Sequence, residues 1–254
     1  MAMTGSEIAK GGFQNEQEVV DKFNNWQNDM DAQSWLQQMM YNIEEIEMVH
    51  AEKIGQKGYK SDINVVIRVN VKKKGQDKLL ETVENIQIKL VSNNKGYNQV
   101  EKKKVAQYKK IWHMPDKIEE LLMLYDGECP PRAGSRDSKR MFVDEFLDEE
   151  RELLRSYLQK HLIMIISDVI RGRGRFAAEW TLVIQKIENE YKWKLIAVNE
   201  AISIYAGDYT VKFTDKGNIR LGNITLQRKG GDNGADSANM LQFKANPLIL
   251  FNKK

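Results

Sequence analysis

Two neighbouring segments with the pattern of β-strands constrain the fold of this chain most strongly. In residues 63–71, apolar side chains occupy every odd position, and Val66 is the only apolar residue at an even one. Such two-residue alternation is typical of a strand that buries one face. Residues 83–91 form the second segment, and the stretch 72–77 between them contains Gly75 and indicates a turn. The sequence therefore predicts a β-hairpin.

Polar residues on this hairpin form a candidate catalytic site. Ser61 and Asp62 open the first strand, and Gln87 and Lys89 lie on the second. Because side chains alternate along a strand, Gln87 and Lys89 point to one face and their apolar neighbours point to the other. An acidic residue before one strand and a polar-x-Lys triplet on the next is an arrangement that many metal-dependent DNA-cutting enzymes use.

The chemistry of phosphodiester hydrolysis suits these residue types. The reaction needs a hard cation, an activated water and a cationic group that stabilises developing charge. Magnesium takes oxygen ligands, so we expect the Asp62 carboxylate, the Gln87 side-chain carbonyl and the backbone carbonyl near Ile88 to bind it. Lys89 is then expected beside the attacking water. Glu16 is a further candidate carboxylate if the first predicted helix packs on the hairpin.

A structural interpretation of the same residues stays open from the pattern alone. A Gln-x-Lys triplet on an exposed strand face is usually solvated surface, and an Asp after a Ser often caps a helix or begins a turn. The neutral Gln87 also leaves one negative charge fewer to hold a metal ion.

Composition limits the class of protein without identifying a partner. The chain has 254 residues, with 39 Lys and Arg against 36 Asp and Glu, and its net charge is +3. Length and apolar content suffice for a buried core. Basic residues gather in short clusters at 72–74, 102–104, 109–110, 171–175 and 228–229. These clusters predict a nucleic-acid footprint if the fold brings them together.

Cysteine usage and hydropathy indicate the compartment. Cys129 is the only cysteine, which excludes an internal disulfide and a cysteine-based zinc site. The start of the chain has no apolar signal core, and no apolar run approaches the length of a membrane span. We therefore expect a cytoplasmic protein.

Element patterns predict two lobes. The breaker-rich stretch Gly127–Ser138 contains Pro130, Pro131 and Gly134, and we expect it to separate a catalytic lobe at 1–126 from a recognition lobe at 139–254. Helices are predicted at about 15–50, 98–112, 117–125, 143–159 and 199–205. Strands beyond the hairpin are predicted at 162–166, 179–187, 191–198, 209–213 and 219–227. The second lobe is therefore expected to be mixed and sheet-rich.

The segment 227–234 is the main candidate for reading DNA bases. It follows a predicted strand and places hydrogen-bonding side chains between glycines, which allow close backbone approach. Arg and Lys suit guanine, Gln and Asn suit adenine, and Asp suits the cytosine amino group in the major groove. The predicted contacts are Gln227, Arg228, Lys229, Asp232 and Asn233. Without other context, a plain polar hairpin tip is the alternative.

Two further polar and basic segments are candidates for DNA contact. Arg171, Arg173 and Arg175 alternate with glycines in a loop that suits phosphate clamping or insertion into a groove, although a solvated loop has the same composition. Asn94, Lys95 and Gln99 follow the strand of Lys89 directly, so we expect them near the scissile bond. The loop of Arg171 lacks the Gly-Lys-Ser/Thr ending of a nucleotide-binding phosphate loop.

Taken together, these segments resemble a known enzyme family. The resemblance lies in residues 12–16, 58–65, 87–93, 127–131, 171–180 and 227–244, and it spans nearly the whole chain. The chain is similar to the small HinP-type type II restriction endonucleases that recognise GCGC, a branch of the PD-(D/E)xK nuclease superfamily. Residues 227–244 are the most specific part of the match.

The resemblance implies a magnesium-dependent endonuclease with Asp62, Gln87 and Lys89 in the catalytic positions. It implies that Gln is usual where the superfamily has Glu or Asp, and that a mixed α/β catalytic lobe, a sheet flanked by helices, adjoins a sheet-rich recognition lobe. It further implies a monomer that cuts double-stranded DNA after the first G of GCGC, leaving a 5′ overhang, and a companion methyltransferase that acts on the same site without direct contact. The connection 72–84 is longer than the family pattern.

The leading prediction is therefore a site-specific DNA endonuclease. One alternative is a sequence-specific DNA-binding protein on an inactivated nuclease fold, with Gln87 as the mark of a lost metal site. Another is a structure-specific repair or junction nuclease that cuts without a defined sequence. Fragments from a magnesium-dependent digest distinguish the three, because they report cutting and sequence together.

Overall fold

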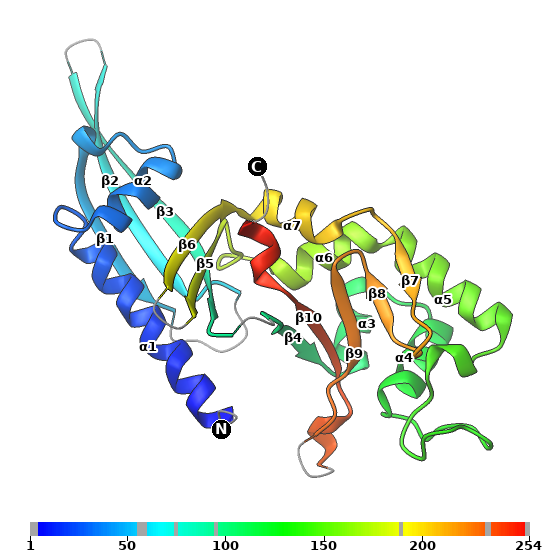
Figure 1. Ribbon diagram of the computed structural model, residues 1–254. Helices are drawn as coiled ribbons and strands as arrows, with labels where there is room; N and C mark the ends of the chain where they lie inside the picture. The colour runs from blue at the N-terminus through cyan, green and yellow to red at the C-terminus, as the bar shows by residue number, and fades with distance from the viewer. Residues whose placement is uncertain are drawn as a thin grey trace. The chain divides into compact units, whose positions relative to one another are not determined.

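The computed structural model of the chain describes residues 5–54, 60–73, 76–93, 96–187, 190–231 and 235–251. These residues belong to two compact units (Figure 1). The first comprises residues 1–94, 171–201 and 250–254, and the second comprises residues 95–170 and 202–249. The stretch Gly127–Ser138, predicted to separate the lobes, thus lies inside the second unit.

The first unit is built on a five-stranded mixed sheet with the order β1-β2-β3-β5-β6. Its strands are β1 (Ile46–Lys53), β2 (Ile63–Lys73), β3 (Gln76–Val91), β5 (Trp180–Ile187) and β6 (Glu190–Ala197). Neighbours are antiparallel except β3 and β5, which pair in parallel. This parallel pair explains why the predicted boundary fails: it draws residues 180–197 into the sheet that carries the hairpin.

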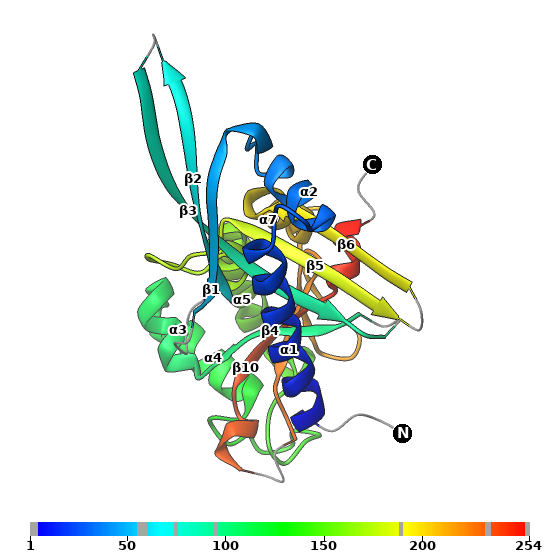
Figure 2. The ribbon, with the colours of Figure 1, turned by 90° about the vertical axis from the view of Figure 1, so that its left-hand side faces the viewer.

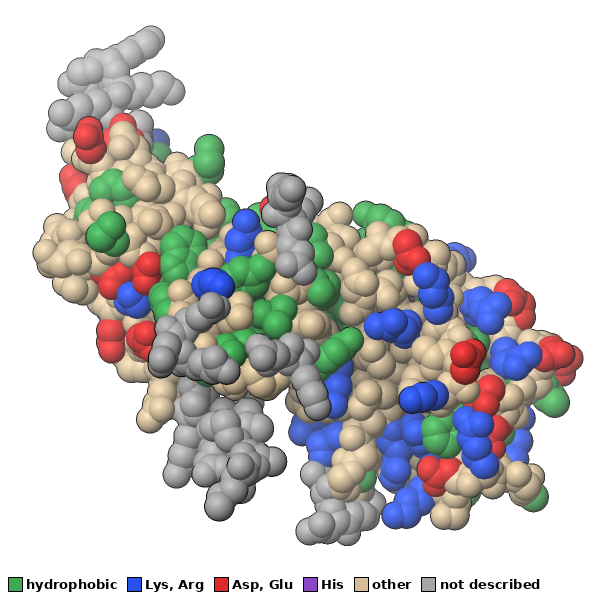
Figure 3. Space-filling model, viewed as in Figure 1, with side chains coloured by type: hydrophobic (Ala, Val, Ile, Leu, Met, Phe, Trp, Pro, Cys, Tyr) green, Lys and Arg blue, Asp and Glu red, His purple; other side chains and the backbone are tan. Residues whose placement is uncertain are grey.

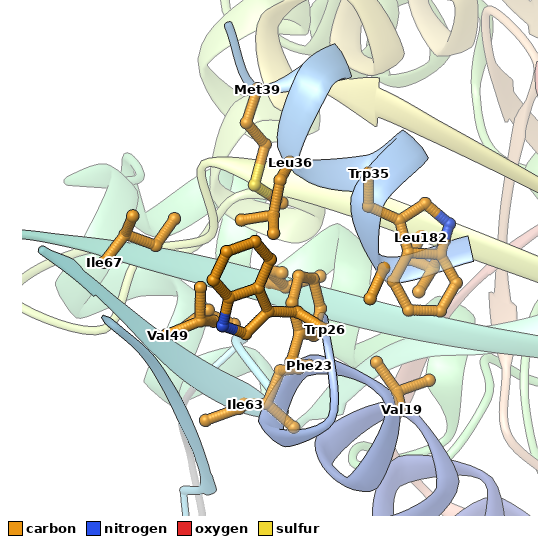
Figure 4. Packing of buried hydrophobic residues seen from close by; sticks show 14 of the residues in the cluster. Val19, Phe23, Trp26, Trp35, Leu36, Met39, Val49, Ile63, Ile67 and Leu182 are labelled. Atoms are coloured by element: carbon orange, nitrogen blue, oxygen red, sulfur yellow. The ribbon is translucent and has the colours of Figure 1, made fainter. Parts of the chain in front are cut away.

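Helices α1 (Gly5–Asn24) and α2 (Met30–Gln38) pack against this sheet. Val19 and Phe23 of α1 and Trp35 of α2 are fully buried with Ile63 and Leu182 of the sheet (Figure 4). The sequence predicts one long helix over 15–50, but the chain turns after Asn24. A new helix then starts at Asp29, whose carboxylate accepts a hydrogen bond from the Ala32 N–H at 2.9 Å.

The hairpin is longer than predicted. The residues assigned to a turn, 72–77, belong largely to strands, because β2 runs to Lys73 and β3 begins at Gln76. Beyond Val69, β2 has no pairing with β1, and β3 pairs with β5 only over Ile86–Val91. The outer part of the hairpin is therefore a two-stranded ribbon that extends past the rest of the sheet (Figure 2). The described residues of the long connection noted in the sequence are paired strand.

The second unit contains an antiparallel sheet with the order β4-β10-β9-β8-β7. The strands are β4 (Asn98–Lys103), β7 (Val211–Phe213), β8 (Ile219–Leu221), β9 (Ile224–Arg228) and β10 (Leu241–Ala245). One face is apolar and carries Leu226, Leu241 and Phe243, which are at most 1% exposed. The Tyr108 and Trp112 rings stack at 4.5 Å and meet the edge of Phe243.

The remaining helices complete the fold. They are α3 (Val105–Trp112), α4 (Asp116–Asp126), α5 (Asp148–Lys160), α6 (Leu162–Ile170) and α7 (Val198–Ala206), with short 3₁₀ helices at Ile43–Glu45, Val143–Glu145, Asp236–Ala238 and Pro247–Phe251. Helix α4 follows Pro115 and ends at Gly127, whose φ of 85° suits glycine. In the described ranges, no helix combines the length and apolar character that a membrane crossing requires.

Two element predictions are wrong for definable reasons. The predicted strand at 162–166 is the start of α6, because a short run in which every residue is apolar fits a buried helix as well as a strand. The predicted helix at 98–112 begins as strand β4 and becomes helical only at Val105. Strands at 179–187 and 191–198 are confirmed within two residues as β5 and β6.

Candidate active site and nucleic-acid interface

Asp62 lies directly before β2 and is fixed by β3. Its backbone N–H donates to the Ile86 carbonyl at 2.9 Å. Its carboxylate oxygen Oδ2 accepts the Ile88 N–H at 2.6 Å. One carboxylate oxygen thus holds the side chain against β3, and Oδ1 forms no hydrogen bond with the described residues.

Gln87 and Lys89 stand on one face of β3, opposite Ile86 and Ile88, which pack in the core beneath α1. Gln87 is 3% exposed and Lys89 is half-buried. The Gln87 Nε2 donates to the Lys60 carbonyl at 3.2 Å. Because the amide nitrogen is used in this way, the amide oxygen is directed elsewhere and can accept or bind a cation.

Glu16 on α1 belongs to the same electrostatic cluster. Burial raises the pKa of the Glu16 carboxyl, and the charge of Asp62 raises it further, whereas Lys53 and Lys89 lower it. Glu16 thus lies within electrostatic range of Asp62 and Lys89, on a helix that packs on the sheet of the hairpin. A carboxyl group with a raised pKa is also a better proton acceptor than an ordinary surface glutamate.

Lys53 is a cation that sequence reasoning missed. It is the last residue of β1 and pairs with Ile63, the residue after Asp62. The signal was available in the partly alternating residues 46–51, in which Ile46, Val49 and Ala51 are buried. That segment was included in the predicted helix, so the end of a strand beside Asp62 was not recognised.

The donor atoms fit a hard divalent cation. Carboxylate oxygens from Asp62 and Glu16, an amide oxygen from Gln87 and backbone carbonyls are oxygen donors of the kind that magnesium takes. Thr181, in register with Gln87 on β5, adds a buried hydroxyl without a hydrogen-bond partner among the described residues. No three His, Cys, Asp or Glu side chains cluster in the described part of the chain.

Ser61 connects the site to the arginine loop. It is 4% exposed, and its hydroxyl donates to the Phe176 carbonyl at 3.0 Å. Gly172 adopts φ 76°, and a Cβ there would lie 2.4 Å from the Lys60 side chain. The Asn85 side chain donates to the Arg175 carbonyl at 3.2 Å. The loop is thus held by residues next to Asp62 and Gln87.

The arginines of this loop lie in the first unit, not with the recognition residues as predicted. Arg171, Arg173 and Arg175 are exposed. The Arg175 guanidinium lies 5.3 Å from the Phe176 ring centre. Arginine guanidinium groups on a loop anchored beside the strands of Asp62 and Gln87 have the chemistry that binds phosphate.

A row of side-chain amides crosses the polar face of the second sheet. Gln227 on β9 donates to Gln242 on β10 at 3.2 Å, and Gln242 donates to Gln99 on β4 at 2.6 Å. The structure thus brings together Gln99 and Gln227, which the sequence singled out separately. It adds Gln242, which is 6% exposed, to their row.

Other residues on this face were also missed. Lys244 pairs with Thr225, and Thr225 pairs with Arg220. The alternation of apolar and polar residues in 241–245 was the available signal. Figure 3 shows Lys and Arg side chains gathered, with some acidic ones, over the lower part of the second unit in that view.

The remaining predicted DNA contacts are partly described. Arg228 donates through Nε and Nη2 to the Asn239 side-chain oxygen at 3.1 and 2.6 Å. Lys229 is half-buried, and its N–H donates to the Met240 carbonyl at 2.9 Å. The predicted contacts Asn94, Lys95, Asp232 and Asn233 lie outside the described residues.

Comparisons with known proteins identify a family and a similar fold. The R.HinP1I restriction endonuclease family matches residues 39–251. A crystal structure of the restriction endonuclease MspI in complex with its cognate DNA is similar in fold, with a TM-score of 0.60 and 14% sequence identity over 91% of this chain and 87% of that chain. The search of curated proteins gave no match. The predicted mixed α/β fold class is confirmed.

Proposed function

The chain belongs to the R.HinP1I restriction endonuclease family, and we propose that Asp62, Gln87 and Lys89 form its catalytic centre. It is a type II site-specific deoxyribonuclease. The observation that carries the assignment is the 2.6 Å hydrogen bond between the Ile88 N–H and the Asp62 carboxylate. That bond joins the acidic residue to the middle of the Gln-x-Lys triplet.

Each residue of the proposed centre has a role that its surroundings support. Asp62, Gln87 and the Ile88 carbonyl would hold a magnesium ion, which supplies Lewis-acid stabilisation of the phosphate charge. Lys89 donates hydrogen bonds from Nζ to the attacking water or a phosphate oxygen. Glu16, with its raised pKa, accepts a proton from the water. Ser61, just before β2, donates a hydrogen bond to the Phe176 carbonyl and thereby positions Asp62.

DNA contact is proposed to divide between the two units. Arg171, Arg173 and Arg175 hold phosphates near the cut, where the arginine loop is tied to the catalytic strands. Base edges are read by a second group. Its members are Gln227, Arg228, Lys229, Asp232 and Asn233, whereas Asn94, Lys95 and Gln99 are proposed to contact DNA near the scissile bond.

The finer properties follow the family resemblance. We propose GCGC as the site, cleavage after the first G with a 5′ overhang, and action as a cytoplasmic monomer. A companion methyltransferase that modifies the same site is also proposed, because a host needs such protection from its own nuclease.

Sequencing the ends of a plasmid digest tests this proposal in one step. Unmethylated plasmid is incubated with the enzyme and magnesium, and the fragment ends are read. Discrete ends at GCGC with a 5′ overhang support the site and the stagger. Ends that share another sequence overturn GCGC, and ends without a common sequence indicate a structure-specific nuclease. Intact but retarded DNA indicates the binding protein considered above.

A further inference from the structure

Arg140 in the second unit is a cation held in place without a strong acidic partner. Its side chain is 15% exposed. Its guanidinium carbon lies 3.9 Å from the Phe142 ring centre and 5.8 Å from that of Tyr125. Stacking on an aromatic ring fixes the plane of a guanidinium group. The Arg140 side chain is therefore preorganised, and it would lose little further conformational entropy on binding a ligand.

The hydrogen-bonding capacity of Arg140 is unused. Its closest acidic neighbour is Asp137, with Nε and Oδ2 separated by 3.8 Å, which is too long for a hydrogen bond. Among the described residues, no acceptor forms a hydrogen bond with its guanidinium. Arg136 on the same Phe142 ring provides a contrast, because both of its terminal nitrogens bind Asp144 at 2.7 Å.

Arg140 opens onto a recess of about 250 Å³. The lining residues are Asp137, Arg140, Asn218, Gln227, Arg228 and Gly230. Arg228 is held by the neutral Asn239 side chain, so the recess contains two arginines and one carboxylate. Burial lowers the pKa of Arg140, Tyr125 and Asp137 partly offset this effect, and the charge of Arg228 adds to it. A ligand rich in hydrogen-bond acceptors would compensate for both the burial of the Arg140 charge and its repulsion by Arg228.

We propose that this recess reads a G·C base pair, with Arg140 binding the O6 and N7 acceptors of the guanine. The inference rests on the proposed function, since it names a specificity residue for the same enzyme. A planar, fixed guanidinium fork matches the two acceptors on the major-groove edge of guanine. Asp137 at the same recess suits the amino group of the paired cytosine. Phosphate holds only acceptors and would leave the carboxylate of Asp137 facing a like charge.

Arg140→Ala is compared with Arg155→Ala as a matched control. Arg155 belongs to the same unit, stacks on the Phe213 ring at 4.9 Å and has a weak acidic neighbour, Glu152, at 3.6 Å, but it does not line the recess. Cleavage rates are measured on short duplexes that contain the site found for the wild-type enzyme. We expect Arg140→Ala to lose on the order of 10- to 100-fold in kcat/KM, and Arg155→Ala to cut like the wild type.

Modified duplexes separate a base contact from a phosphate contact. Replacing each guanine of the site by 7-deazaguanine removes N7 alone. The wild type should lose activity at one such position, and Arg140→Ala should lose nothing more there. Arg140→Ala could instead stay sensitive to every 7-deazaguanine and become insensitive to a neutral methylphosphonate linkage. In that case Arg140 contacts a phosphate, and the proposal that it reads a base is wrong. A wild-type rate for Arg140→Ala also overturns the proposal.

Arg140→Lys and a thermal unfolding curve keep the test valid if the alanine variant folds poorly. Lysine keeps the charge but not the fork, so a folded Arg140→Lys variant that discriminates like the wild type contradicts the proposal. A different result is expected if the proposed nuclease function itself is wrong. The wild-type enzyme would then leave every duplex uncut, whereas failure of this inference alone leaves wild-type cleavage intact.

Discussion

The two sheets of this enzyme present their polar residues in opposite ways. In the first unit, the polar side chains of the site are few and at least half-buried: Gln87 is 3% and Thr181 1% exposed, and Asp62 and Lys89 are half-buried. In the second unit, polar residues spread over a sheet face that includes the exposed Gln99 and the half-buried Gln227. Bond breaking needs a few fixed groups shielded from water, whereas base reading needs a broad accessible surface.

The means of positioning differ as well. Asp62 and Gln87 are held by hydrogen bonds to backbone groups of neighbouring segments. Gln99, Gln242 and Gln227 hold one another through side chains. A substitution in the first unit should therefore affect the rate of cleavage, and one in the second unit should affect which sequence is cut.

Lys89→Ala should give the largest effect. Removing the ammonium group beside the reacting phosphate takes away stabilisation that exists only at the active site, so cleavage should fall by on the order of 10³-fold. DNA affinity should change little, because binding relies on many other contacts. Cleavage assays and gel shifts measure the two separately, with Lys160→Ala as a control on an exposed helix end. Wild-type cleavage by Lys89→Ala would falsify the catalytic assignment.

Gln87→Glu should lower cleavage by roughly tenfold at saturating magnesium. The new carboxylate would face the Lys60 carbonyl in place of a donating amide, currently 3.2 Å away, and would add negative charge near Asp62 and Glu16. Single-turnover rates across a magnesium titration check this expectation. An unchanged or higher rate would mean that the neutral ligand is merely tolerated.

Gln242→Leu should reduce sequence discrimination more than total activity. The buried Gln242 is the middle of the amide row, so its loss leaves both neighbours without their partner. We expect roughly tenfold weaker discrimination between the site and single-base variants of it. Gln99→Ala, at the exposed end of the row, should cost less. Equal effects of the two variants would show that the row does not act as a unit.

Asp126→Asn should give the smallest effect, on stability alone. Burial of Asp126 raises its pKa from 3.8 to about 8, so the folded state keeps a proton that the unfolded chain releases. Stability therefore falls as pH rises from about 4 to 8. The amide removes this penalty and should raise the melting temperature by a few degrees at pH 8.5 but not at pH 4. A pH-independent gain would exclude titration of Asp126 as the cause.

The comparison also shows what sequence patterns can and cannot predict. The paired strands and the shared face of Gln87 and Lys89 could be predicted because strand alternation is local and fixes the face of each side chain. The assignment of β5 and β6 to the first unit could not be predicted. The parallel pairing of β3 with β5 joins segments that are far apart in the sequence, and no local sequence pattern indicates it. Arg140 was overlooked for a related reason: it follows the breaker-rich stretch directly, and only the fold brings it to Arg228.

The chain passes between the units after residues 94, 170, 201 and 249, and this interleaving has a consequence for synthesis. When the ribosome has made the hairpin with Asp62 and Lys89, the neighbouring strand β5 is still about 90 residues from being translated. The sheet that carries Asp62 and Lys89 is thus completed only after most of the other unit has been synthesised. Since a chain emerges at about 5–20 residues per second, this sheet stays incomplete for seconds, and a fragment ending at residue 126 lacks two of its five strands.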